Sequence, residues 1–191
     1  MQGILKYIYP KIEFWEAIQV LKFAFIGAFI AGLYGVLHDQ VTYTISPEYF
    51  TKLKFAQFQY ANVGISDRFF VGTIGFLATW WVGLFIGWFL GRRYVPKQSF
   101  NCAKRSILTG YMIVFIAAIF SAIGGWAYGL FANHNEMVSD WYYTLDYYGI
   151  SNGVEFVRVA YIHSFSYAGG LIGLLITFLL IKPQVHYGPV I

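Results

Sequence analysis

The sequence predicts an all-α fold, a bundle of four transmembrane helices in one membrane domain that covers residues 1–191. Of the 191 residues, 58% are hydrophobic and only 12% are charged, whereas a soluble domain usually carries about 25% charged residues. Aromatic side chains make up 21% of the chain, and Trp and Tyr gather at membrane interfaces. Four apolar stretches each reach the roughly 20 residues that cross the hydrocarbon core. The lipid bilayer is therefore the first partner that the sequence predicts.

The spans follow one another along the chain after a short leading segment. Residues 1–16 combine charged and aromatic side chains, as a segment at the membrane interface does. The predicted spans are 17–37, 69–90, 106–131 and 159–181. The loops between them are 38–68, 91–105 and 132–158. Length and flanking charge set these limits, because helices that are apolar on all sides show no useful periodicity.

The basic residues predict the orientation of the helices. The 91–105 loop contains five of the thirteen basic residues and no acidic residue. The positive-inside rule places this loop and both termini in the cytoplasm, so that the 38–68 and 132–158 loops face outward. The same topology accounts for the net charge of +4 without a nucleic-acid partner. We therefore expect a multi-pass protein of the bacterial inner membrane.

Both outward loops carry helix-start signals, so we expect them to be structured. Ser46-Pro47-Glu48 combines an N-cap residue, a proline at the first helical position and an acid near the positive end of the helix. Asn152 and Glu155 have the spacing of a capping box. The first signal predicts a short helix along the outer surface, and the second predicts that the last helix begins before the bilayer.

The two outward hairpins share a sequence pattern. Each leaves its first span through Tyr-Gly, turns through Gly-Ile-Ser, and meets an arginine before its second span. The matching positions are Tyr34-Gly35 with Tyr128-Gly129, Gly64-Ile65-Ser66 with Gly149-Ile150-Ser151, and Arg68 with Arg158. We interpret the pattern as a duplicated helix–loop–helix hairpin, related by an axis along the membrane normal.

Small residues recur every four positions on the spans. Gly83, Gly87 and Gly91 form such a ladder on the second span. Small residues at this spacing let two helix backbones approach closely. The ladder predicts either packing within the bundle or contact with a second copy or another membrane subunit.

Histidines and acids gather at the outer ends of the spans. Three of the four histidines, His38, His134 and His163, lie there together with Asp39 and Glu48. His163 lies within an apolar helix, where an ionisable group usually points into the bundle and finds a partner. His38 and Asp39 are the nearest candidates by depth.

The sequence leaves four interpretations of this cluster open. Zinc or copper fits a set drawn from His38, Asp39, Glu48, His134 and His163, because imidazole and carboxylate groups suit such ions. A single haem b needs only His38 and His163 as axial ligands. The cluster also fits a proton or quinol site among Tyr and Trp side chains. In the fourth interpretation, His163 bonds Asp39 or a backbone carbonyl and nothing is bound.

Several other functions are excluded or disfavoured. The single cysteine, Cys102, rules out an intrachain disulfide, and no CxxC, HExxH, GxSxG or phosphate-binding glycine motif occurs. The spans contain no Asp, Glu or Arg that would carry ions across the whole membrane. Whether the protein is an enzyme stays open at this point.

Two runs, residues 38–50 and 157–167, resemble those of a family of small, uncharacterised bacterial four-span membrane proteins. No activity comes with that resemblance. It covers the outer halves of the first and fourth spans and implies that His38 and His163 lie together. The leading hypothesis is a polar site around His38, Asp39 and His163 that binds a metal or a redox cofactor. The alternative is a non-catalytic accessory subunit that packs through its glycine ladders.

Overall fold

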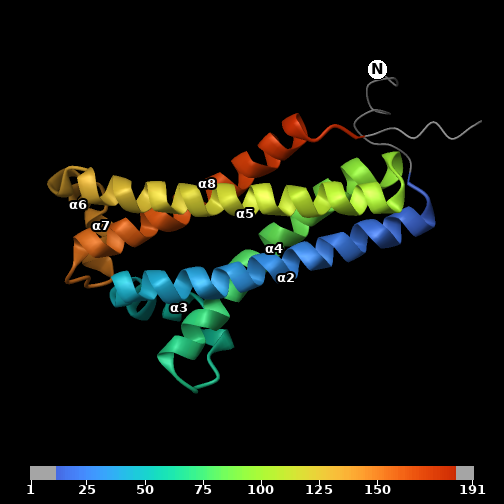
Figure 1. Cartoon of the computed structure of the whole chain (residues 1–191). Coiled ribbons are helices and arrows are strands. Elements are labelled where there is room, and N and C mark those ends of the chain that lie inside the picture. The colour runs from blue at the N-terminus through green and yellow to red at the C-terminus, as the bar shows by residue number, and fades with distance from the viewer. Residues whose placement is uncertain (1–11, 184–191) are drawn as a thin grey trace, which may run out of the picture.

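The computed structural model describes residues 12–183, and the secondary structure of that part of the chain consists of helices, without a strand (Figure 1). Its four long helices are α2 (Phe14–Ile45), α4 (Asp67–Tyr94), α5 (Phe100–Phe131) and α8 (Gly153–Leu180). Each is long and apolar enough to cross a membrane. The predicted all-α, four-helix fold class is confirmed, and the spans indicate a multi-pass membrane protein. Most of the predicted interfacial segment, and also His186, lie outside the described residues.

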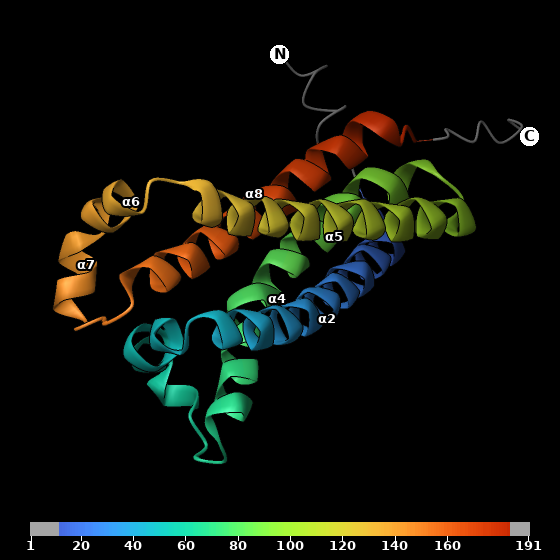
Figure 2. The ribbon, with the colours of Figure 1, turned by 60° about the vertical axis from the view of Figure 1, so that its left-hand side comes forward.

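The two long loops are structured. The first contains the π-helical segment η1 (Tyr49–Lys54), the helix α3 (Phe55–Gln57) and the 3-10 turn η2 (Gln59–Ala61); the second contains α6 (His134–Asp140) and α7 (Tyr142–Tyr147). A second 3-10 turn, η3 (Val95–Lys97), joins α4 to α5. Figures 1 and 2 show α6 and α7 at one end of the bundle, at the same end as η1 and α3. This is called the loop end below.

The four predicted spans fall on the four long helices, but α2 extends well beyond the predicted first span. It continues past Leu37 to Ile45 and ends where Ser46 adopts an extended backbone, with φ −136° and ψ 94°. The reason is local, because Pro47 disfavours helical geometry in the residue before it and nothing earlier interrupts the helix. His38 and Asp39 therefore lie inside a helix rather than in a loop.

The chain forms two tight helical hairpins. α2 packs along α4 and α5 packs along α8, with far less close packing between the pairs. On α4, Gly83 and Gly87 lie against the backbone of Gly27 and Phe23 of α2. Gly91 lies against Val20 of the same helix. The sequence left open whether the α4 ladder packs within the bundle or contacts another subunit. In the structure it packs against α2 of the same chain.

The two hairpins are closed in the same way at the loop end. Gly64 and Gly149 have positive φ, +74° and +58°, and each precedes a long helix. Arg68 donates to the Gln40 carbonyl at 3.0 Å, and Arg158 donates to the Gly129 carbonyl at 3.3 Å. In each hairpin an arginine at the start of the second helix therefore holds the backbone of the first helix. These parallels agree with the matching sequence pattern.

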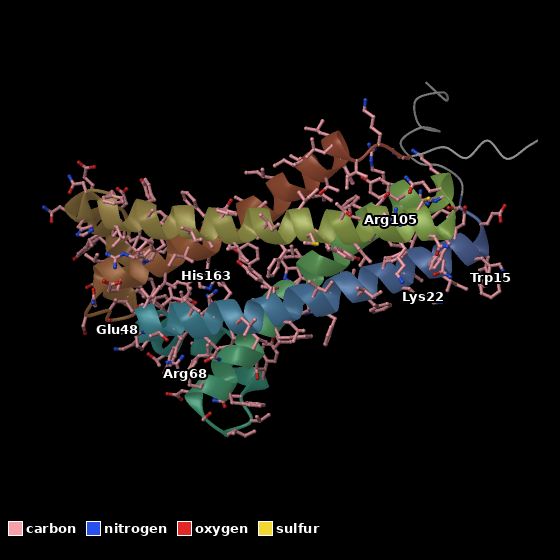
Figure 3. The ribbon with its side chains drawn as sticks, viewed as in Figure 1. Trp15, Lys22, Glu48, Arg68, Arg105 and His163 are labelled. Carbon is pink, nitrogen blue, oxygen red and sulfur yellow. The ribbon has the colours of Figure 1, made fainter. Side chains whose placement is uncertain are left out.

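The labelled side chains show the two ends of the bundle. Trp15, Lys22 and Arg105 lie at one end, whereas Glu48 and Arg68 lie at the loop end (Figure 3). His163 lies between α2 and α8, on the loop-end side of the middle. A buried apolar cluster lies beneath the loops and a second one toward the other end. The predicted orientation, with the loop end outside the cytoplasm, stays a prediction.

Candidate metal site

His163 and Asp39 form a buried pair between α8 and α2. The His163 Nε2 atom lies 3.1 Å from Asp39 Oδ1, and the two side chains are 13% and 6% exposed. His163 Nδ1 lies 2.9 Å from the Val159 carbonyl oxygen. That oxygen can only accept, so Nδ1 carries a proton. The contact with Asp39 therefore holds one further proton, located on Nε2 or on the carboxyl group.

His38 lies beside this pair on α2. Its Nδ1 atom lies 3.2 Å from the Tyr34 hydroxyl, which in turn lies 2.7 Å from Ser166 Oγ on α8. The rings of His38 and His163 meet edge to face, with centroids 4.8 Å apart. His38 Nε2, however, is buried and has no hydrogen-bond partner. Leaving such an atom unsatisfied costs about 1–3 kcal/mol.

The three side chains are arranged as a ligand set. One ligand atom from each of His38, Asp39 and His163 lies within 4.8 Å of the other two. In both histidines Nδ1 has a partner, the Tyr34 hydroxyl or the Val159 carbonyl. Metal-binding histidines are usually oriented in this way by a partner on the other ring nitrogen. Nε2 of each ring therefore faces the cluster: that of His38 has no hydrogen-bond partner, and that of His163 contacts Asp39.

The helices place these groups through simple spacing. Tyr34 lies four residues before His38, and Val159 lies four residues before His163, so each partner lies one helical turn away on the same face. Tyr34 and Ser166 were not predicted as site residues. The four-residue spacing of Tyr34 from His38 was the available signal. For Ser166, the signal was its place on α8, three residues after His163.

The loop end of the cluster is covered by aromatic rings. Pro47 turns the chain back after α2, and η1 then lays Tyr49 on His163 in a stacked contact, with centroids 5.1 Å apart. Phe50 adds a second contact with the same imidazole. Tyr49 and Phe50 are both buried, and burial raises the pKa of the Tyr49 phenol, which keeps it neutral. No sequence signal marked these two residues as part of the site.

On its other side the cluster faces a cavity of about 90 Å³ inside the bundle. Its polar wall includes the cluster and its partners Tyr34 and Ser166, together with Thr79, Tyr111 and Tyr167. The rest of the wall is mainly apolar and includes Ile30, Val82, Ile86, Val114 and Phe115. A single water needs roughly 10–15 Å³ of such space, so the cavity has room for a larger group.

The structure does not bring the other two candidate ligands into the cluster. The Glu48 carboxylate accepts hydrogen bonds from the backbone N–H of Asn152 at 2.8 Å and of Ser151 at 3.1 Å. These bonds, that of Asn152 first, lower the pKa of Glu48. His134 begins α6 and is exposed. Glu48 thus joins η1 to the start of α8, and the cluster consists of His38, Asp39 and His163.

The geometry gives little support to haem. Axial ligands must stand on opposite faces of the macrocycle. The imidazoles of His38 and His163 already touch edge to face. A porphyrin between them would require α2 and α8 to separate.

Comparisons of the chain with protein-family models, curated proteins and solved structures gave no match. The function is therefore argued from the geometry of the cluster and its cavity.

Proposed function

We propose that the protein binds one divalent transition metal ion, Zn²⁺ in the first place, through His38, Asp39 and His163. The observation that carries this proposal is the unpartnered His38 Nε2 atom, buried beside the hydrogen-bonded Asp39–His163 pair. The fourth interpretation, a hydrogen-bonded pair with nothing bound, accounts for Asp39 and His163. It leaves His38 Nε2 without a role.

The distances permit such a site after a small adjustment. Zinc–ligand distances of about 2.0–2.1 Å place tetrahedral ligands roughly 3.3 Å apart. The three ligand atoms now lie within 4.8 Å of one another, so shifts of about 1 Å in side-chain position complete the geometry. The proton between Asp39 and His163 leaves when a cation takes its place.

The surrounding hydrogen bonds suit this ligand set. With its proton on Nδ1, His38 donates to the Tyr34 hydroxyl, and Tyr34 donates to Ser166 Oγ. This tautomer frees the Nε2 lone pair for the metal. His163 has the matching arrangement, because its Nδ1–H donates to the Val159 carbonyl. Such partners fix ring orientation and raise ligand basicity.

Two nitrogens and one carboxylate oxygen also suit copper. Three protein ligands leave at least one position open, as in catalytic zinc sites, where the metal lowers the pKa of a bound water to about 7. His38, Asp39 and His163 all line the internal cavity, so an ion held by them would be within reach of a small molecule there.

A cobalt titration tests the proposal. Protein purified in mild detergent is stripped with a chelator and titrated with Co²⁺, whose visible absorption reports its coordination. We expect saturation for the wild type and for His134→Ala, the matched exposed histidine. We expect no saturable band for His38→Ala or His163→Ala. Equal titrations for all four proteins would contradict the proposal.

The contacts of the α4 ladder favour the metal proposal over the accessory-subunit alternative. The glycines of that ladder contact α2 of the same chain, so they account for packing within the bundle without a second subunit.

We place the protein in a bacterial inner membrane with the loop end outside the cytoplasm. This placement is supported by the five basic residues of the 91–105 loop, at the opposite end.

A further inference from the structure

A second hollow lies on the membrane-facing side of the cluster. It is a groove of about 400 Å³ between α2 and α5. Its walls include Leu37, Val41 and Ile45 from α2, and Ile119, Ile123 and Trp126 from α5. Tyr34, His38 and Phe115 line both this groove and the internal cavity. The groove therefore ends at the candidate metal site.

The groove has the character of a surface that faces lipid. Leu37 and Val41 are 68% and 63% exposed on a helix that is apolar enough to span the membrane. Apart from His38, its lining contains no ionisable side chain other than Tyr34. It lies at the boundary between the two hairpins, where α2 and α5 lack the close packing found within each hairpin. A molecule dissolved in the bilayer can occupy it without breaking a tight helix contact.

Access from the loop end is obstructed. Tyr49 and Phe50 cover His163 on that side, and both are buried. The groove and the cavity, in contrast, meet at Tyr34 and His38. The path that the described residues offer to the cluster thus begins in the bilayer.

The chemistry of the path selects a class of molecule. Its apolar length suits a hydrocarbon chain, and the scarcity of charge disfavours an ionic headgroup. Aromatic rings line its inner end. The Tyr34 ring lies near two others: its centroid is 5.5 Å from that of Phe115 and 5.3 Å from that of His38. Rings of this kind favour a flat, conjugated ring as headgroup, and its oxygens would meet the polar edge that Tyr34 and His38 form at the inner end of the groove.

We propose that the groove binds an isoprenoid quinone or quinol from the membrane, with its tail along α2 and α5 and its ring at Tyr34 and His38. This inference rests on the proposed function in placing the headgroup at the same cluster. It adds the class of ligand and the direction from which that ligand arrives.

The test uses decylubiquinone and the full-length protein in lipid nanodiscs. Ala122 lines the groove on α5 and does not line the internal cavity, so Ala122→Phe fills the groove from a helix that carries none of the candidate ligands. Leu171→Phe places the same ring on an exposed position of α8 and is the control. We expect saturable binding for the wild type and the control, and at least tenfold weaker binding for Ala122→Phe. Dodecanol as a competitor shows whether the ring is needed, and we expect it not to displace the quinone.

Metal content measured on the same samples separates the two proposals. If the quinone fails to saturate, or binds Ala122→Phe as tightly as wild type, the groove proposal is overturned even when metal is present. Displacement by dodecanol would likewise overturn the choice of a quinone headgroup. If the quinone binds as expected to a protein that takes up no metal, the metal proposal fails and the groove proposal stands. An unchanged melting temperature for Ala122→Phe excludes loss of binding through misfolding.

Discussion

His163 on α8 contacts Asp39 on α2 across 124 positions of sequence, with 3.1 Å between Nε2 and Oδ1. This contact joins two helical hairpins that otherwise pack loosely against each other. Next to it lies His38 with a buried, unpartnered nitrogen. The pair and its neighbour therefore define both the joint between the hairpins and the proposed metal site.

The first prediction concerns ligand-linked stability. Adding Zn²⁺ to chelator-treated wild type raises its melting temperature, because a ligand that binds only the folded state stabilises it by about 2.7 kcal/mol at one hundred times its Kd. His38→Phe keeps an aromatic ring but lacks a ligand atom, so its melting temperature should not respond to zinc. Thermal unfolding in detergent with and without zinc makes the comparison. A shift of equal size in both proteins would show that zinc binds elsewhere.

The second prediction tests the hydrogen bonds behind His38. Tyr34→Phe removes the hydroxyl between His38 Nδ1 and Ser166 Oγ. Loss of such a partner typically weakens metal binding by about 10- to 100-fold. Competition with a chelator of known affinity measures the change. Tyr128→Phe, on a ring that packs on Tyr161 away from the cluster, should bind as wild type; no change in Tyr34→Phe would remove Tyr34 from the site.

The third prediction follows from Glu48. Its lowered pKa means that the folded state holds the carboxylate form, so this contribution to stability is present at neutral pH and is lost as the pH falls through the folded pKa. Glu48→Gln should unfold at a lower temperature than wild type at pH 7, and the difference should shrink below about pH 4.

Melting curves between pH 7 and pH 3 test this account of Glu48. Glu136→Gln is the matched control, since Glu136 lies in the first turn of α6 and is exposed. A difference between wild type and Glu48→Gln that stays constant over the pH range would disagree with a role for the Glu48 charge.

The fourth prediction concerns the packing of the hairpins. Gly83→Ala places a methyl group against the Gly27 carbonyl of α2, and overpacking of this kind typically costs 1–3 kcal/mol. Gly170→Ala adds the same methyl where no atom lies within 4 Å, so it should be neutral or stabilising. Melting temperature and size-exclusion chromatography compare the two. If Gly83→Ala left the melting temperature unchanged but altered the oligomeric state, the ladder would serve a partner after all.

Much of the fold could be predicted because hydropathy and length decide transmembrane helices. The residues at which the helices end were harder to predict. The first span was expected to end at the polar residues after Leu37, whereas α2 continues to Ile45 because Pro47 is the first residue that interrupts it. The glycine ladder on α4 predicted a closely packed neighbouring helix, but the spacing of the glycines does not tell whether that helix belongs to the same chain.

The site was predictable in part for a related reason. His38, Asp39 and His163 could be grouped by their depth along the helices, and the structure places them together. Glu48 and His134 were predicted at the same face of the membrane, but the paths of the loops decide their positions. Those paths depend on contacts such as that of Glu48 with Asn152, which join segments far apart in the sequence. The cover formed by Tyr49 depends on the same folded loop.

Elemental analysis of the purified protein tests the central claim most directly. Wild type, His38→Ala, His163→Ala and His134→Ala are prepared in mild detergent and measured by plasma mass spectrometry, before and after incubation with zinc and copper. We predict near-stoichiometric metal in wild type and His134→Ala, and its loss in the two variants of the cluster. A wild-type protein that stays free of metal after incubation, or cluster variants that retain it, would contradict the account.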